Sequence, residues 1–186
     1  MDSRTTPPAA ALVTGAASGI GQYCAEALSA RGTRVAAVDV DQARLHRVAE
    51  TSPLITPFVC DVSDEHQVQT SVKAAQGAVG PFDRVIHCAG VARLGRLREQ
   101  SSADIERVWR VNYLGTVHVA RATITAMTDR GAGDLMVMAS IAGWVPVPSG
   151  GAYGASKAAV MDAEPPPCGT PDVWRLPCSA PCWNAS

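Results

Sequence analysis

The feature that most constrains the fold of this chain is a glycine-rich turn between an apolar run and a helical segment. The apolar run at residues 10–14 leads into the sequence Thr14-Gly15-Ala16-Ala17-Ser18-Gly19-Ile20-Gly21, and helical spacing follows over residues 19–30. Glycines let the backbone turn tightly and approach a pyrophosphate, which the helix N-terminus stabilises. Asp39 closes the next apolar run, 18 residues after Gly21, where a carboxylate can bind an adenosine ribose. A tight turn plus a surface aspartate is the structural alternative, but the combination predicts a dinucleotide site.

Apolar runs and helical segments alternate over the first 160 residues. The runs at residues 10–14, 34–39, 55–60, 83–87 and 134–139 are predicted strands. Predicted helices cover residues 19–30, 41–50, 64–79 and 103–129, with Ser63 as the expected N-cap of the third, and a last helix starts near Tyr153 and runs through Met161. Nearly continuous apolar strands that alternate with helices predict a doubly wound α/β fold, with a parallel sheet covered on both faces.

Charge and hydropathy exclude several classes of protein. The 186 residues contain 16 Lys and Arg against 17 Asp and Glu, so the net charge of −1 argues against a nucleic-acid or membrane-surface protein that works by bulk charge. No apolar run approaches the roughly 18 residues of a membrane-spanning helix. The polar N-terminus does not read as a signal peptide, so a cytoplasmic protein with no nucleic-acid or membrane partner is expected. Six cysteines over this length indicate scattered thiols.

Five further segments follow in a specific order. Asp61 and Val62 come after the third predicted strand, and His87-Cys88-Ala89-Gly90 comes after the fourth. Asn112 lies in the long predicted helix, Ser140 ends the fifth strand, and Tyr153-x-x-x-Lys157 begins 13 residues later. With the spacing Gly-x-x-x-Gly-x-Gly after Thr14, residues 9–162 resemble the short-chain dehydrogenase/reductase family, whose Rossmann-like sheet has the strand order 3-2-1-4-5.

The resemblance implies a set of site residues. The catalytic residues would be Asn112, Ser140, Tyr153 and Lys157, which would exchange hydride between a nicotinamide and a secondary alcohol or ketone. The cofactor-binding residues would be Thr14, Gly15, Ser18, Gly19, Ile20, Gly21, Asp39, Asp61, Val62, Ala89, Gly90, Tyr153 and Lys157, and no metal is expected. Tyr153 and Lys157 share one helix face. A phenol ordinarily loses its proton near pH ~10, and the positive charge of Lys157 would help it act as a base near neutral pH.

The carboxylate of Asp39 also favours NAD over NADP. It would face the 2′-phosphate of NADP, and two unit charges about 4 Å apart repel by about 4 kcal/mol at an effective dielectric constant of 20. Neither Ser18 nor Val40 is a basic residue that could offset this repulsion.

Several residues have simpler explanations. Ser140 could satisfy a loop amide, Tyr153 could be a partly buried core residue, and Asn112 could bond within its helix. His87 and Cys88 replace the family's usual Asn-Asn, which puts a local tie of the sheet in doubt. A catalytic pair of His87 and Cys88 is not expected, because adjacent residues of a strand point to opposite faces. The tail cysteines Cys168, Cys178 and Cys182 lack a His or a four-ligand spacing, so free thiols are expected. The arginines between 93 and 98 are read as a solvated loop.

The last segment departs from the rest. Residues 165–186 hold 6 of the 13 prolines and form a predicted irregular tail after a domain at residues 1–164. Family members continue with further strands, so the hypothesis is a chain that is truncated or frameshifted near residues 161–164, and the family's homo-oligomer is in doubt. The alternatives are a non-catalytic dinucleotide-binding fragment, a non-functional product or, from the extended branch of the superfamily, a sugar-nucleotide epimerase. The small-molecule substrate is not identified.

Overall fold

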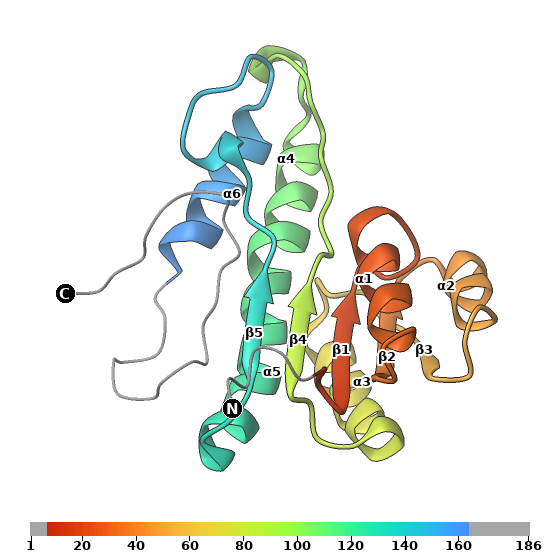
Figure 1. The fold of residues 1–186 in the computed structure, drawn as a ribbon. Coiled ribbons are helices and arrows are strands. Elements are labelled where there is room, and N and C mark those ends of the chain that lie inside the picture. The colour runs from red at the N-terminus through yellow and green to blue at the C-terminus, as the bar shows by residue number, and fades with distance from the viewer. Residues whose placement is uncertain (1–6, 164–186) are drawn as a thin grey trace.

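The computed structural model describes residues 7–163, which form a parallel five-stranded sheet with helices on both faces (Figure 1). The strands are β1 (Ala10–Thr14), β2 (Arg34–Asp39), β3 (Ile55–Val59), β4 (Arg84–His87) and β5 (Asp134–Val137). Their order is β3-β2-β1-β4-β5, which confirms the predicted fold and strand order. The ends of β1 and β2 are as predicted, and β3, β4 and β5 each differ at one end by one or two residues. The predicted tail at residues 165–186, with its three cysteines, lies outside the described residues. The hypothesis of a break near residues 161–164 also concerns a segment that extends beyond them.

Alternate residues of the strands build two cores. Ala10 and Leu12 of β1 pack with buried residues of α3 (Glu65–Val79) and α5 (Gly115–Arg130) on one face. Ala11 and Val13 pack with α1 (Gly19–Ser29) and α2 (Gln42–Ala49) on the other face. Every residue of β1 is buried, because this central strand is covered on both faces. The carboxyl ends of the strands therefore meet at one edge of a rigid sheet, where the loops carry the predicted site.

The N-cap of α3 corrects a detail of the sequence analysis. Asp64, and not Ser63, caps this helix by accepting a hydrogen bond from the backbone N–H of Gln67 (3.0 Å). Ser63 is instead engaged by Asp61, whose Oδ1 accepts from both the backbone N–H (2.9 Å) and the hydroxyl of Ser63 (2.8 Å). The carboxylate at position 64 also suits the positive end of the helix. The cap thus leaves Asp61 and Ser63 as a separate turn at the sheet edge.

The long helix predicted at residues 103–129 contains an unpredicted irregular turn. It consists of α4 (Ser102–Trp109), a π-helical turn (Arg110–Leu114) and α5, which run as one continuous rod in Figure 1. The last helix, α6 (Gly151–Asp162), begins two residues before the predicted start and lies beside α4 and the π-helical turn. None of the helices between residues 7 and 163 is long and apolar enough to cross a membrane.

Candidate active site

The glycine turn closes against the ends of two strands. Gly15 and Gly19 have φ angles of +68° and +54°, in the left-handed region that glycine adopts without strain. Gly21 faces the turn so closely that an added Cβ would lie 2.2 Å from the carbonyl oxygen of Gly15. The three glycines therefore let the backbone of β1 turn directly into α1, with the first N–H groups of that helix at the sheet edge.

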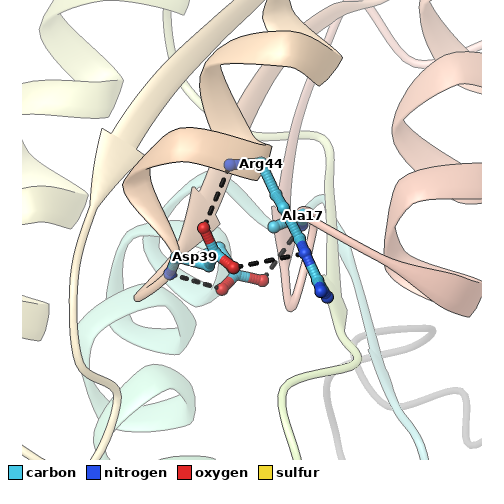
Figure 2. Close-up of polar contacts among 4 residues, drawn as sticks. Ala17, Asp39 and Arg44 are labelled. Atoms are coloured by element: carbon cyan, nitrogen blue, oxygen red, sulfur yellow. Dashed lines mark hydrogen bonds and ion pairs between the residues drawn. The ribbon is translucent and has the colours of Figure 1, made fainter.

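Asp39 is held in place by the backbone on both sides of it (Figure 2). Its Oδ2 accepts a hydrogen bond from the N–H of Ala17 in the glycine turn (3.0 Å), and its Oδ1 accepts from the N–H of Asp41 (2.9 Å). Asp41 caps α2 through the N–H of Arg44 (3.0 Å) and forms an ion pair with the Nε of that arginine (3.4 Å). The carboxylate of Asp39 thus joins the glycine turn to the end of β2. These two hydrogen bonds also fix the orientation of the carboxylate, whose remaining lone pairs can accept from a ligand.

Asp61 and Val62 form the next part of the same edge. One oxygen of Asp61 is used by Ser63, and the N–H of Asp61 donates to Gln67 Oε1 (3.1 Å). The carbonyl oxygen of the buried Val62 lies 3.0 Å from His118 Nδ1, in a hydrogen bond that joins the loop to α5. These contacts fix the segment after β3 against the long helix.

The ends of β1 and β4 are tied by side chains. Thr14 Oγ1 accepts a hydrogen bond from the N–H of Ala89 (3.2 Å) and lies 2.7 Å from His87 Nδ1. A Cβ added to Gly90 would lie 3.7 Å from Lys157 Nζ, so this residue places the β4 loop beside the α6 lysine. His87 and Thr14 thus provide a local tie at the position where the resemblance put one in doubt.

Asn112 holds three segments together from within the π-helical turn. Its Oδ1 accepts from the N–H of Val91 (2.8 Å), and its Nδ2 donates to the carbonyl oxygen of Val91 and to Ser156 Oγ (both 3.0 Å). The side chain is fully buried. The amide therefore pins the loop after β4 and helix α6 to the long helix. It lies within a π turn, a distortion that is frequent at functional sites.

Ser140, Tyr153 and Lys157 come from β5's exit and from α6. Ser140 Oγ accepts from the N–H of Ala142 (3.2 Å), which starts a short 3₁₀ turn. This turn packs closely on α6, because a Cβ added to Gly154 would lie 2.8 Å from the carbonyl oxygen of Ala142. Lys157 is buried, and its Nζ donates to the carbonyl oxygen of Met138 (2.6 Å). Burial lowers the pKa of the Lys157 ammonium, and the neighbouring Cys88 opposes this shift.

One cavity of about 1470 Å³ unites most of the predicted residues. Twelve of the fifteen line it: Gly15, Ser18, Gly19, Ile20, Gly21, Asp39, Asp61, Val62, Ala89, Gly90, Tyr153 and Lys157. Thr14 and Asn112 are buried behind its wall, and Ser140 lies outside the lining. A single cavity thus connects the glycine turn to the Tyr153 and Lys157 pair, as a long ligand would require.

Several residues of the cavity wall were not predicted from the sequence. The additional apolar ones include Val40, Val111, Leu114, Met138 and Ala139, together with His118. Positions 111, 114 and 118 follow the i, i+3, i+7 spacing of one helix face, so periodicity around Asn112 could have revealed them. Val40, Met138 and Ala139 carry no comparable signal, because apolar residues at strand ends are ordinary.

Comparison with known proteins identifies the family. A model of the short chain dehydrogenases matches residues 9–163. The chain belongs to the short-chain dehydrogenase family. Among its relatives in this family, D-threitol dehydrogenase from Mycolicibacterium smegmatis is 37% identical over 155 residues, which are 81% of this chain and 60% of that protein. A 2,3-dihydro-2,3-dihydroxybenzoate dehydrogenase from Bacillus subtilis is 32% identical over 81% of this chain and 59% of its own length.

Solved structures of short-chain dehydrogenases agree with the described fold. A short chain dehydrogenase/reductase from Burkholderia phymatum, solved in complex with NAD, superposes with a TM-score of 0.81 at 34% sequence identity. The match covers 84% of this chain and 57% of that one. The chain therefore spans about 60% of the length of these three family members.

The remaining alternatives from the sequence concern side chains beside the site. Cys88 packs with the α1 face, whereas His87 bonds Thr14, so these neighbours do not form a pair. Among residues 7–163, no group of three or more His, Cys, Asp or Glu side chains is placed to hold a metal ion. In the loop after β4, Arg93 and Arg98 form exposed ion pairs with Asp104 (3.6 Å) and Glu99 (3.5 Å).

We expect His87 to make the stability of this chain sensitive to acid. Burial, with a smaller contribution from the charge of Lys157, lowers the pKa of His87 from 6.5 to about 3. The folded chain keeps the imidazole neutral, whereas the unfolded chain protonates it below pH ~6.5, so the free energy of unfolding falls as the pH falls between these values. This contribution approaches about 1.4 kcal/mol per pH unit.

Urea unfolding between pH 7 and pH 4.5 measures the effect. His87→Asn should reduce the loss of stability at low pH, because asparagine takes up no proton. His46→Asn, at an exposed position of α2, is the matched control and should leave the loss unchanged. Equal pH dependences of the unchanged chain and the His87→Asn variant would contradict the prediction.

Proposed function

We propose that this chain binds NAD(H) in the 1470 Å³ cavity and carries the catalytic residues of an oxidoreductase that interconverts a secondary alcohol and a ketone. The observation that carries the proposal is that Tyr153 and Lys157 line the same cavity as the glycine turn and Asp39. A phosphate-binding turn and a candidate acid–base pair on one wall suit a dinucleotide that delivers its reactive ring to a substrate.

The residues present fit a nicotinamide dinucleotide along the whole cavity. Gly15, Gly19 and Gly21 would hold the pyrophosphate at the α1 N-terminus. Gly15 and Gly21 let the turn pack tightly against neighbouring backbone, and Gly19 leaves open space beside the turn. Asp39 would bind the adenosine ribose, with its orientation already fixed by Ala17 and Asp41. Asp61 would use the oxygen that Ser63 leaves free to accept from the adenine amino group. The solved NAD complex of the Burkholderia phymatum relative supports this assignment.

The remaining predicted cofactor contacts complete the assignment. Ser18 and Ile20 line the wall within the glycine turn, and Val62, Ala89 and Gly90 line it along the loops after β3 and β4. Thr14 would act from behind the wall, because its hydroxyl holds Ala89 and His87.

Three side chains would perform the proton chemistry. A bound nicotinamide supplies the carbon that accepts or donates the hydride. The hydroxyl of Tyr153 would take the proton from the alcohol oxygen, or return it to the ketone oxygen in the reverse direction. Ser140 Oγ accepts from Ala142 and keeps its own proton, which it can donate to the same substrate oxygen. The ammonium of Lys157 uses one N–H on Met138 and would stabilise the ionised Tyr153 and bond the ribose with the others.

The Asn112 side chain would serve this chemistry by holding neighbouring segments in place, not by contacting the reacting atoms. Its side-chain amide makes three hydrogen bonds within the protein and is fully buried, so a water molecule of a proton relay cannot reach it from the cavity. The role of holding that water would fall to its main-chain carbonyl, where the Thr116 hydroxyl donates to one lone pair (2.6 Å). We therefore assign the Asn112 side chain to holding Val91 and Ser156 in place.

The composition of the loop after Ser140 favours an uncharged substrate over a charged one. Residues 141–150 contain no acidic or basic side chain, and Ile141, Trp144 and Val145 are 71%, 59% and 49% exposed. This loop begins at the proposed substrate-orienting hydroxyl, so its apolar side chains would contact the carbon skeleton of the alcohol.

A titration and a turnover assay test the proposed function. NADH fluorescence should change on addition of the chain and saturate, and uncharged secondary alcohols should be oxidised with NAD⁺ in preference to alcohols that carry a carboxylate or an amine. NADH binding without turnover of any alcohol or ketone would reduce the proposal to a dinucleotide-binding module, and the absence of binding would overturn it.

The preference for NAD over NADP is a separate prediction. The chain should bind NADH at least about tenfold more tightly than NADPH, because the Asp39 carboxylate repels the additional phosphate. Asp39→Asn should narrow this ratio, since the amide oxygen can still accept one backbone hydrogen bond without the charge. Glu65→Gln removes one negative charge elsewhere on the cavity wall and should leave the ratio unchanged. Equal affinities of the unchanged chain for NADH and NADPH would contradict the prediction.

A further inference from the structure

Two cysteines from distant parts of the sequence meet beside the cavity. Cys24 lies on α1, and Cys88 directly follows β4. Their thiols are in hydrogen-bond contact, and both side chains pack against the core between the sheet and α1. Both residues are partly exposed and unoxidised, and Cys88 also lines the cavity. The proposed chemistry uses neither thiol.

The third cysteine of the described residues provides a contrast. Cys60 is 2% exposed, and its hydrogen-bond partner is Ser71 and not another thiol. Among the three cysteines of residues 7–163, Cys24 and Cys88 therefore contact each other, whereas Cys60 contacts neither of them. A pair in contact can form an intramolecular bond without large movements of the backbone, which a lone cysteine cannot.

The surroundings make the two thiols chemically unequal. Burial raises the pKa of both, and for Cys88 the charge on Cys24 and the hydrogen bond to it raise the pKa further, to about 12. The same hydrogen bond opposes the increase at Cys24. Cys24 thus forms the thiolate more readily, and Cys88 stays protonated next to it. Because the thiolate is the form that reacts with a peroxide, Cys24 is the more reactive of the two, although burial makes both thiols slower to react than an exposed cysteine.

We propose that Cys24 and Cys88 form a reversible disulfide when the chain meets a hydroperoxide. The Cys24 sulfur attacks the peroxide, the O–O bond breaks, and a sulfenic acid and one water (or alcohol) result. The Cys88 sulfur then attacks the Cys24 sulfur, the S–O bond breaks, water leaves and the S–S bond forms. Two thiols lose two protons and two electrons, which the hydroperoxide accepts.

The crosslink should disturb the glycine turn. A disulfide holds its sulfurs ~2.05 Å apart, closer than two hydrogen-bonded thiols, so we expect a small shift of one of the two elements in addition to side-chain rotation. Cys88 is fixed because β4 pairs with both β1 and β5 and because its N–H donates to the carbonyl oxygen of Thr14 (3.2 Å). We therefore expect the first turns of α1, which begin in the glycine turn, to be the part that shifts toward β4. Oxidation should then weaken binding of the dinucleotide, a consequence that rests on the proposed function.

Peptide mapping tests the crosslink itself. The full-length chain is treated with hydrogen peroxide, its remaining thiols are alkylated, and it is digested with trypsin. The expected product joins peptide 5–31 to peptide 85–93, lighter by two hydrogen atoms than the sum of the two, and it disappears on reduction. Cys60→Ser should keep this product, whereas Cys24→Ser and Cys88→Ser should lose it. Cys24 and Cys88 that stay alkylatable, or that pair mainly with other cysteines, would overturn the proposal.

NADH titration tests the consequence. Peroxide should lower the NADH affinity of the unchanged chain at least about tenfold, with recovery on reduction, because binding groups must be held within about 0.5 Å. Cys24→Ser should keep its NADH affinity after the same treatment. A crosslinked chain that binds NADH as tightly as the reduced chain would overturn the effect on the site. If the reduced chain binds no NADH, the proposed function fails, and the peptide map still decides whether the disulfide forms.

Discussion

Tyr153→Phe should lower the turnover of a secondary alcohol by about 10²–10⁴-fold, the usual contribution of a general acid or base, while NADH affinity changes less than about twofold. The substitution removes one oxygen and keeps the ring, so the wall of the cavity retains its shape. The contact of the Tyr153 carbonyl oxygen with the Ser156 hydroxyl (2.8 Å) belongs to the backbone and is unaffected. The measurements are steady-state turnover with NAD⁺ and NADH titration of the same protein.

Two other substitutions separate chemistry from structure. Tyr23→Phe removes the same oxygen from a residue of α1 that is 72% exposed, and its turnover should equal that of the unchanged chain. Lys157→Met removes the ammonium that donates to Met138 but keeps most of the side-chain volume, and it should weaken both turnover and NADH binding. A Tyr153→Phe variant that retains more than about a tenth of the turnover would show that another group carries the proton.

The sequence predicted the fold because its signals are local and repeated. Apolar runs, helical segments and glycines at the turns all agree, and the observed order β3-β2-β1-β4-β5 confirms the prediction that they and the resemblance supported. The cavity likewise gathers twelve of the fifteen predicted residues, because the carboxyl ends of parallel strands meet at one edge. The roles of these residues remain predictions.

The contacts between segments could not be read from the sequence. The π-helical turn leaves the apolar spacing of residues 103–129 almost unchanged, and the Asn112 side chain within it bonds Val91 and Ser156, which lie far from it in the sequence. The tie between Thr14 and His87 and the contact between Cys24 and Cys88 likewise join residues far apart in the chain. Even the N-cap of α3 depended on tertiary context, because Asp61 engages Ser63 and leaves Asp64 to cap the helix.

Two glycine substitutions test whether the close backbone approach in the glycine turn exists in solution. In an exposed helix, Gly→Ala normally stabilises by roughly 0.5–1 kcal/mol, because alanine loses less backbone freedom on folding. Gly77 of α3 is such a position, since an added Cβ meets nothing within 4 Å. Gly77→Ala should therefore raise the free energy of unfolding in urea.

Gly21→Ala should have the opposite sign, although Gly21 is also helical. Its Cβ would lie 2.2 Å from the carbonyl oxygen and 2.6 Å from the carbonyl carbon of Gly15, which are backbone atoms that no rotamer change can move away. Overpacking of this kind costs about 1–3 kcal/mol or more, and any relief displaces Gly15 from the ends of β1 and β4. Urea unfolding should show a lower free energy, and NADH titration a loss of affinity. If Gly21→Ala were as stable as Gly77→Ala, the close approach that shapes the turn would be absent in solution.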